Sequence, residues 1–136
     1  MKTKDIKAIK KSAAHWWRHA NGKARNGETI EAAHCALCQT HHECWTCPLH
    51  RSNHGCEETY GARGPWREAS DALRAAGHRD SPWECNDMDF LEAAQDMFET
   101  LIWLLPKGES WTDPEGWTWY SPKPWNGENV GPKPWL

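Results

Sequence analysis

Residues 81–106 read SPWECNDMDFLEAAQDMFETLIWLLP, and this stretch decides the fold. Its apolar residues repeat at helical spacing, and Pro106 is where such a helix must end. Ser81, Pro82 and Glu84 form a capping-box start with proline in the first turn. We expect this helix to form the centre of the core, through Leu91, Ala94, Phe98, Leu101 and Leu105, with Met97, Ile102 and Leu104 widening the stripe.

Three shorter segments also show helical signals. The pattern predicts a helix over residues 4–20, with Asn21-Gly22 as its stop. A second helix is predicted over 64–77, where Pro65 suits the first turn and Gly77 suits the end. Residues 28–33, ETIEAA, are expected to form a short helical turn. The apolar face of the helix over 4–20 is formed by Ile6, Ile9, Ala13, Trp16 or Trp17, and Ala20. The apolar face of the helix over 64–77 is formed by Trp66, Ala69, Leu73 and Ala76.

From residue 106 onward the composition changes to Pro, Gly and Trp, and PKPW occurs twice, at 122–125 and 132–135. WTWY, residues 117–120, reads as a short strand, and the rest as extended chain. The chain has eleven Trp, and a disordered tail rarely carries many of them. We expect this segment to pack across the helices or, as the less favoured alternative, to bind a partner.

The most distinctive stretch is residues 34–56, HCALCQTHHECWTCPLHRSNHGC, which holds five of the six cysteines. Two C-x2-C pairs are typical of tetrahedral zinc sites. The five-residue gap between the pairs is short for a zinc ribbon, so several ligand sets stay open. We predict zinc ligands in decreasing order of preference: Cys35 and Cys38, then Cys47 and Cys56, then Cys44. His34, His41, His42, His50 or His54 could replace one thiolate.

Other chemistry for these cysteines is less favoured. The spacing matches neither common ferredoxin pattern, which argues against an iron–sulfur cluster. The basic N-terminus is not followed by an apolar stretch of signal-peptide length, and no run of about 18 apolar residues is present. We therefore expect a cytoplasmic protein without a membrane span, whose cysteines are metal ligands rather than disulfides. A closed four-ligand site would be structural.

Charge is distributed unevenly along the chain. Residues 1–25 carry eight Lys and Arg against one Asp, whereas the whole chain has a net charge of −3. A nucleic-acid surface is one interpretation, formed by Lys7, Lys10, Lys11, Trp16, Trp17 and Arg18. Residues 80–136 hold eleven acidic and three basic side chains, which would repel phosphate. Such an acidic surface could instead fit a basic groove on another protein.

No catalytic motif is found, and we predict that the chain is not an enzyme. His50, Asn53 and His54 invite comparison with HNH nucleases, but no histidine follows Asn53 at the required distance. The C-x2-C pairs lack the βαβ pattern of thioredoxin-type proteins. An HNH-like nuclease is therefore the least favoured of the functions considered.

One pattern along the chain combines an early Trp16, C-x-L-C at 35–38, C-x2-C-P-L at 44–49, Gly-Cys at 55–56 and Tyr60. In this pattern the chain resembles a group of small Cys-rich proteins encoded by phages and prophages. The resemblance covers roughly residues 13–105. It implies a phage-related protein that binds metal and works inside a bacterial cell, but it implies no activity.

Together these observations predict a mainly α fold: a helical zinc-binding domain at 1–105 and a Trp/Pro-rich segment at 106–136. The function we expect is that of a phage accessory protein that binds and modulates a host protein, for example in a bacterial defence system. The alternative is a zinc-stabilised nucleic-acid-binding protein. The sequence does not fix the oligomeric state.

Overall fold

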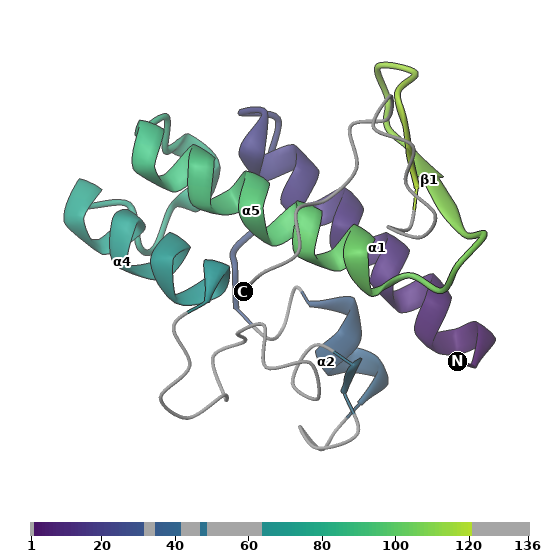
Figure 1. Cartoon of the computed structure of the whole chain (residues 1–136). Helices are drawn as coiled ribbons and strands as arrows, with labels where there is room; N and C mark the ends of the chain where they lie inside the picture. The colour runs from purple at the N-terminus through teal and green to yellow at the C-terminus, as the bar shows by residue number, and fades with distance from the viewer. Residues whose placement is uncertain (1, 32–34, 42–46, 49–63, 121–136) are drawn as a thin grey trace.

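The computed structural model describes residues 2–31, 35–41, 47–48 and 64–120, and its described part is mainly helical, as predicted (Figure 1). The elements in chain order are α1 (Thr3–Ala20), α2 (Ala36–Thr40), α4 (Pro65–Ala76), the 3-10 turn η3 (Pro82–Glu84), α5 (Met88–Leu104), β1 (Ser110–Thr112) and β2 (Thr118–Tyr120).

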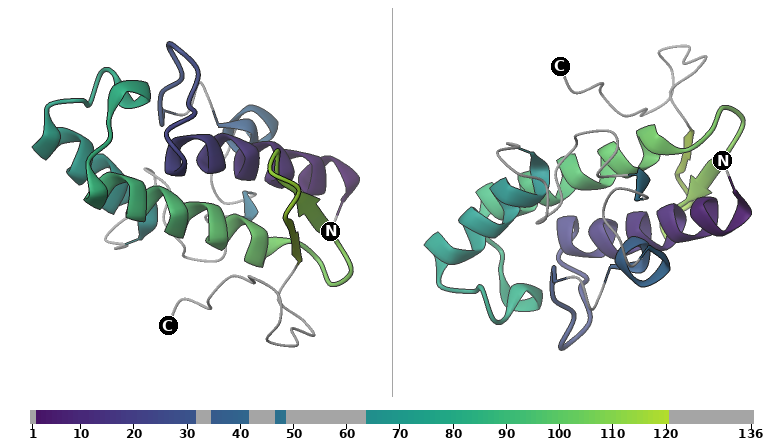
Figure 2. Two further views of the ribbon diagram at one scale, coloured as in Figure 1. Left: turned by 90° about the horizontal axis from the view of Figure 1, so that it is seen from above. Right: turned by 90° about the horizontal axis from the view of Figure 1, so that it is seen from below.

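Helix α5 is the centre of the core. It packs along α1 and also against α4, while α2 lies against α1 (Figure 2). The predicted stripe is confirmed: Phe98 and Leu101 are fully buried, and Leu91 and Leu104, near its two ends, are half-buried. Neither α5 nor any other helix in the described ranges is both long enough and apolar enough to cross a membrane.

The predicted start of α5 was wrong. Ser81 makes no capping hydrogen bond, and Pro82–Glu84 forms a separate 3-10 turn. The cap is Asp87, whose Oδ2 accepts the backbone N–H groups of Asp89 and Phe90 at 3.1 and 3.3 Å. A carboxylate at a helix N-terminus satisfies free N–H groups and also meets the positive end of the helix dipole, so it outcompetes the serine six residues earlier.

The end of α1 was predicted correctly. Gly22 has φ +67°, and the N–H of Lys23 donates to the carbonyl of Arg18 at 2.8 Å, which is a Schellman ending. Residues 28–31 are not helical, contrary to the expected turn over 28–33; residues 32–34 lie outside the described part. The reason is tertiary: the carbonyl of Ile30 accepts the Trp66 indole N–H at 3.0 Å, which draws this segment toward α4.

The segment after α5 forms an antiparallel hairpin, in which Trp111 is paired with Trp119. The strand predicted at 117–120 is confirmed as Thr118–Tyr120, and its partner strand was not predicted. Both tryptophans place their rings against Phe98 of α5, at centroid distances of 5.5 and 4.8 Å. The hairpin therefore packs against α5, whereas the packing of the whole segment 106–136 across the helices stays a prediction. The two PKPW repeats lie outside the described residues.

Candidate metal centre

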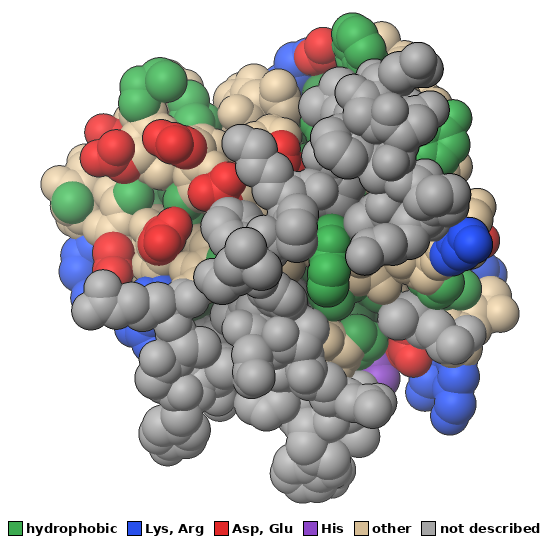
Figure 3. All heavy atoms as spheres, in the orientation of Figure 1, with side chains coloured by type: hydrophobic (Ala, Val, Ile, Leu, Met, Phe, Trp, Pro, Cys, Tyr) green, Lys and Arg blue, Asp and Glu red, His purple; other side chains and the backbone are tan. Residues whose placement is uncertain are grey.

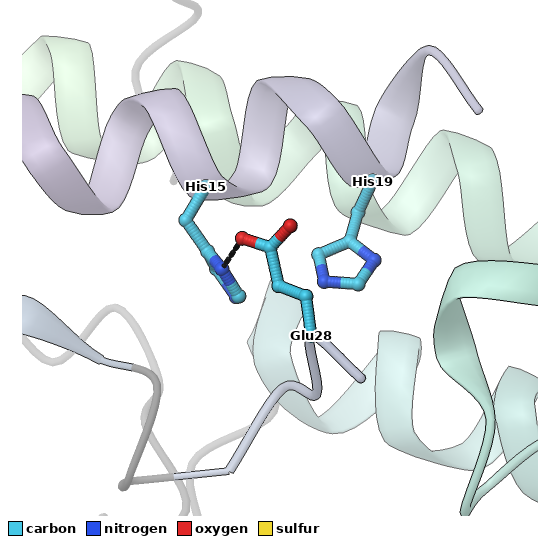
Figure 4. Close-up of side chains that lie close together, drawn as sticks. All are labelled: His15, His19 and Glu28. Carbon is cyan, nitrogen blue, oxygen red and sulfur yellow. Dashed lines mark hydrogen bonds and ion pairs between the residues drawn. The ribbon is translucent and has the colours of Figure 1, made fainter. Parts of the chain in front are cut away.

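Three potential metal ligands meet inside the protein, beside α1. His15 and His19 are four residues apart on that helix, so they lie on one face, and Glu28 reaches them from the loop after the helix (Figure 4). One ligand atom from each residue lies within 4.8 Å of the other two. All three side chains are buried, which is unusual for charged or titratable groups without a function or a partner.

Glu28 is held by four hydrogen bonds. Nδ1–H of His15 donates to Oε2 at 2.5 Å, and Arg18 donates to both carboxylate oxygens, at 2.5 and 3.1 Å. The backbone N–H of Arg25 donates to Oε1 at 3.0 Å. Burial acts to raise the pKa of Glu28, but the bonds from His15 and Arg18 outweigh it and hold that pKa well below its usual range. Glu28 is thus a carboxylate, and its orientation is fixed.

His19 is the unusual member of the group. It is 1% exposed, and neither ring nitrogen has a hydrogen-bond partner among the residues that the structure describes. The backbone of Thr29 lies near enough to favour the protonated ring slightly. Burial, and to a lesser extent the neighbouring His15, lower the pKa of His19 to about 3, against the opposing effect of Glu28. The ring is therefore a neutral imidazole with a free lone pair.

The chemistry of this group suits a divalent transition metal. A neutral imidazole needs no deprotonation before it binds, and two imidazoles with one carboxylate are a common ligand set for zinc and for iron. Tetrahedral ligands at about 2.1 Å from zinc lie about 3.4 Å apart, so ligand atoms that lie within 4.8 Å of one another would have to close by at most about 1.4 Å. The positive charge of the Arg18 guanidinium would disfavour a metal cation bound to Glu28. The same guanidinium orients the carboxylate, as hydrogen-bond partners of metal ligands commonly do.

A second interpretation is that His19 is a core residue. Its ring lies among other rings, with centroids 4.7 Å from His15, 5.8 Å from Trp16 and 5.8 Å from Phe90. Edge-to-face packing of this kind stabilises aromatic cores without metal. It does not account for two buried nitrogens without partners, because an unpaired buried polar group costs roughly 1–3 kcal/mol.

The predicted cysteine ligands are described in part. Cys35 and Cys38 lie at the start of α2, and a hydrogen bond from the Cys38 thiol is the main reason why the pKa of Cys35 is lowered to about 6. Cys47 is buried, and Cys44 and Cys56 lie outside the described residues. A joint site of these cysteines therefore stays a prediction, as do the roles of His50, Asn53 and His54, which also lie outside. Cys85 is buried.

One of the predicted cysteine ligands and two members of the histidine group face a common space. A cavity of about 660 Å³ is lined by His15, Glu28 and Cys35, together with residues of α1, α2 and the loop 21–31. This arrangement brings Cys35 near the histidine group, which the sequence interpretation overlooked.

The residues suggested for nucleic-acid stacking are placed differently. Trp16 and Trp17 are 3% and 4% exposed, so neither presents a ring to a base, and this part of the interpretation was wrong. Both rings lie on the apolar face of α1, because removing their large apolar surface from water is more favourable than exposing it to solvent. Lys10 pairs with Glu109 at 2.9 Å, and Arg18 is held by Glu28. Lys7 and Lys11 are exposed.

The sequence did contain a signal for the new group. HWWRH places two histidines four apart on a predicted helix, which is a known metal-binding spacing. The sequence predicted no contact between the segment that contains Glu28 and that helix, so the three residues are brought together only in the tertiary structure.

Comparison with protein families, with curated proteins and with solved structures gives no match to this chain. The relation to phage proteins therefore stays a prediction. The candidate site rests on its own geometry.

Proposed function

We propose that this chain is a zinc-binding accessory protein, in which His15, His19 and Glu28 hold the ion. The observation that carries the proposal is the pair of unpartnered nitrogens on a fully buried His19, beside two further ligand atoms. Zinc is the ion we propose because it accepts imidazole and carboxylate ligands without a strict geometry. A fourth ligand would come from water or from a side chain on the adjoining cavity.

The proposed role of the ion is structural. Its ligands come from α1 and from the loop that returns to α1, so the ion would join two segments that otherwise meet through the Glu28 hydrogen bonds. An ion that binds only the folded chain adds about 2.7 kcal/mol of stability at a free concentration of 100 times its Kd. We propose the cysteine window as a second zinc site of the same structural kind.

The test is metal stoichiometry, measured by native mass spectrometry and elemental analysis on freshly purified protein. The wild type is compared with His19→Phe, which keeps a ring among rings, and with His78→Gln, which removes a half-buried histidine after α4. We expect His19→Phe to lose one equivalent of zinc and His78→Gln to lose none. Equal zinc content in all three proteins would refute a site at His19.

We also propose that the stabilised domain binds a host protein with a basic surface. Acidic side chains gather over α4 and α5 (Figure 3). They line a groove of about 300 Å³ between these helices: Glu68, Asp89, Glu92 and Asp96. Complementary charge speeds association and selects partners, which suits an accessory protein that acts by binding a partner.

The partner proposal is tested by comparing two variants with equal net charge. Glu68→Gln with Glu92→Gln removes two charges from the groove, and Glu109→Gln with Glu115→Gln removes two from the hairpin side. We expect a partner captured from bacterial lysate by the wild type to be lost with the groove variant and kept with the control. Capture that is equal for both variants would contradict an α4–α5 interface.

A further inference from the structure

The cavity beside the candidate metal centre has a basic wall. Lys11 and Arg18 extend from α1, and Arg25 comes from the loop that follows it. Glu28 is the only carboxylate on this wall among the described residues, and it is already paired with Arg18 and hydrogen-bonded to His15. Lys11 and Arg25 are exposed and make no ion pair within the described part of the chain.

The charge of the wall stays positive when its thiol is included. Cys35 also lines the cavity, and as a thiolate it would offset one of the cations. Three cations then face one carboxylate and one thiolate, which leaves a net positive wall on a chain whose overall charge is −3. A local field of opposite sign to the whole molecule marks a site that concentrates anions.

The shape of the wall suits a small ligand. The cavity of about 660 Å³ falls within the range of pockets that bind small molecules. Its lining includes the small side chains Ala14 and Ala36, and also Gly27, which has φ +88° and no atom within 4 Å of the position that a Cβ would occupy. The backbone at Gly27 therefore leaves room for a ligand to approach closely.

We propose that this cavity binds a small phosphate-bearing anion, with Lys11 and Arg25 as its principal contacts. Two separated cations on different segments match the charge and the several acceptor oxygens of a phosphate group. Arg18 lies on the same wall and orients Glu28. The proposal does not require a metal at His19, because neither principal contact is a candidate metal ligand.

The test is calorimetric titration of the full chain at low salt with inorganic phosphate, pyrophosphate and a nucleoside 5′-monophosphate. The variant Lys11→Gln with Arg25→Gln removes both principal contacts. Its matched control is Lys4→Gln with Lys7→Gln, which removes two exposed charges from the same helix but outside the cavity. We expect about a tenfold or greater loss of affinity in the first variant, and less than about twofold in the control.

Three results would overturn the proposal. The wild type could bind none of the small phosphates, both variants could lose affinity equally, or the cavity variant could bind as well as the wild type. A single-stranded oligonucleotide is titrated in parallel. Binding of the oligonucleotide without binding of small phosphates would assign the basic residues of α1 to a nucleic-acid backbone and would reject the cavity as a small-ligand site.

Discussion

His19 should make the protein sensitive to mild acid. Its pKa is about 3 in the folded protein against an ordinary 6.5, so between these values the unfolded chain binds the extra proton. The free energy of unfolding is therefore independent of His19 protonation above about pH 6.5, and it decreases as the pH falls from 6.5 toward 3. At 1.36 kcal/mol for each pKa unit, lowering the pH from 7 to 5 should cost about 2 kcal/mol at this residue. Glu28 adds its own loss only near and below its ordinary pKa of 4.5.

The assay is urea unfolding at pH 7 and pH 5, on protein purified without added metal. We expect the wild type to lose about 2 kcal/mol more than His19→Phe between these pH values, because phenylalanine keeps the ring contacts and cannot be protonated. His78→Gln should behave as the wild type does. Equal pH dependence in the wild type and in His19→Phe would refute the claim that His19 is buried as a neutral ring.

Further substitutions test the supports of the site and of the fold, all by urea unfolding at pH 7. Glu28→Gln should cost about 3 kcal/mol because it leaves buried donors without their carboxylate, whereas Glu115→Gln, in an exposed ion pair, should cost less than about 1 kcal/mol. Asp87→Ala should cost about 1 kcal/mol through loss of the α5 cap, and no loss would reject it as the cap. Trp119→Ala should lower the free energy of unfolding by about 3 kcal/mol, because Trp119 is buried. Trp117 is 60% exposed, so Trp117→Ala should change it by no more than about 0.5 kcal/mol. Similar costs for both substitutions would contradict the packing of the hairpin.

The helices could be predicted from the sequence because their signals are local. Apolar spacing and stop residues located α1, α4 and the end of α5 to within one or two residues. The start of α5 was missed because two capping signals compete there, and the choice of Asp87 depends on the turn at Pro82–Glu84. The strand at 110–112 was missed because its pairing with Thr118–Tyr120 is set by the intervening turn.

The candidate site was harder to predict because its residues are joined only in three dimensions. The cysteine window drew attention through its density, while the two histidines of HWWRH read as part of a basic aromatic surface. In the structure the Trp16 and Trp17 rings are buried, and His15 and His19 on the same helix are buried beside them. Glu28 then completes the group because the Schellman ending at Gly22 turns the loop back along α1.

The central claim is that zinc binds to nitrogen and oxygen ligands beside α1, and X-ray absorption at the zinc edge tests it most directly. Zinc–nitrogen and zinc–oxygen distances are about 2.0–2.2 Å, whereas zinc–sulfur distances are about 2.3 Å. The account predicts a nitrogen and oxygen shell in the zinc-loaded wild type that disappears in His19→Phe, while any sulfur shell from the cysteine window stays. A sulfur shell alone, identical in both proteins, would contradict it.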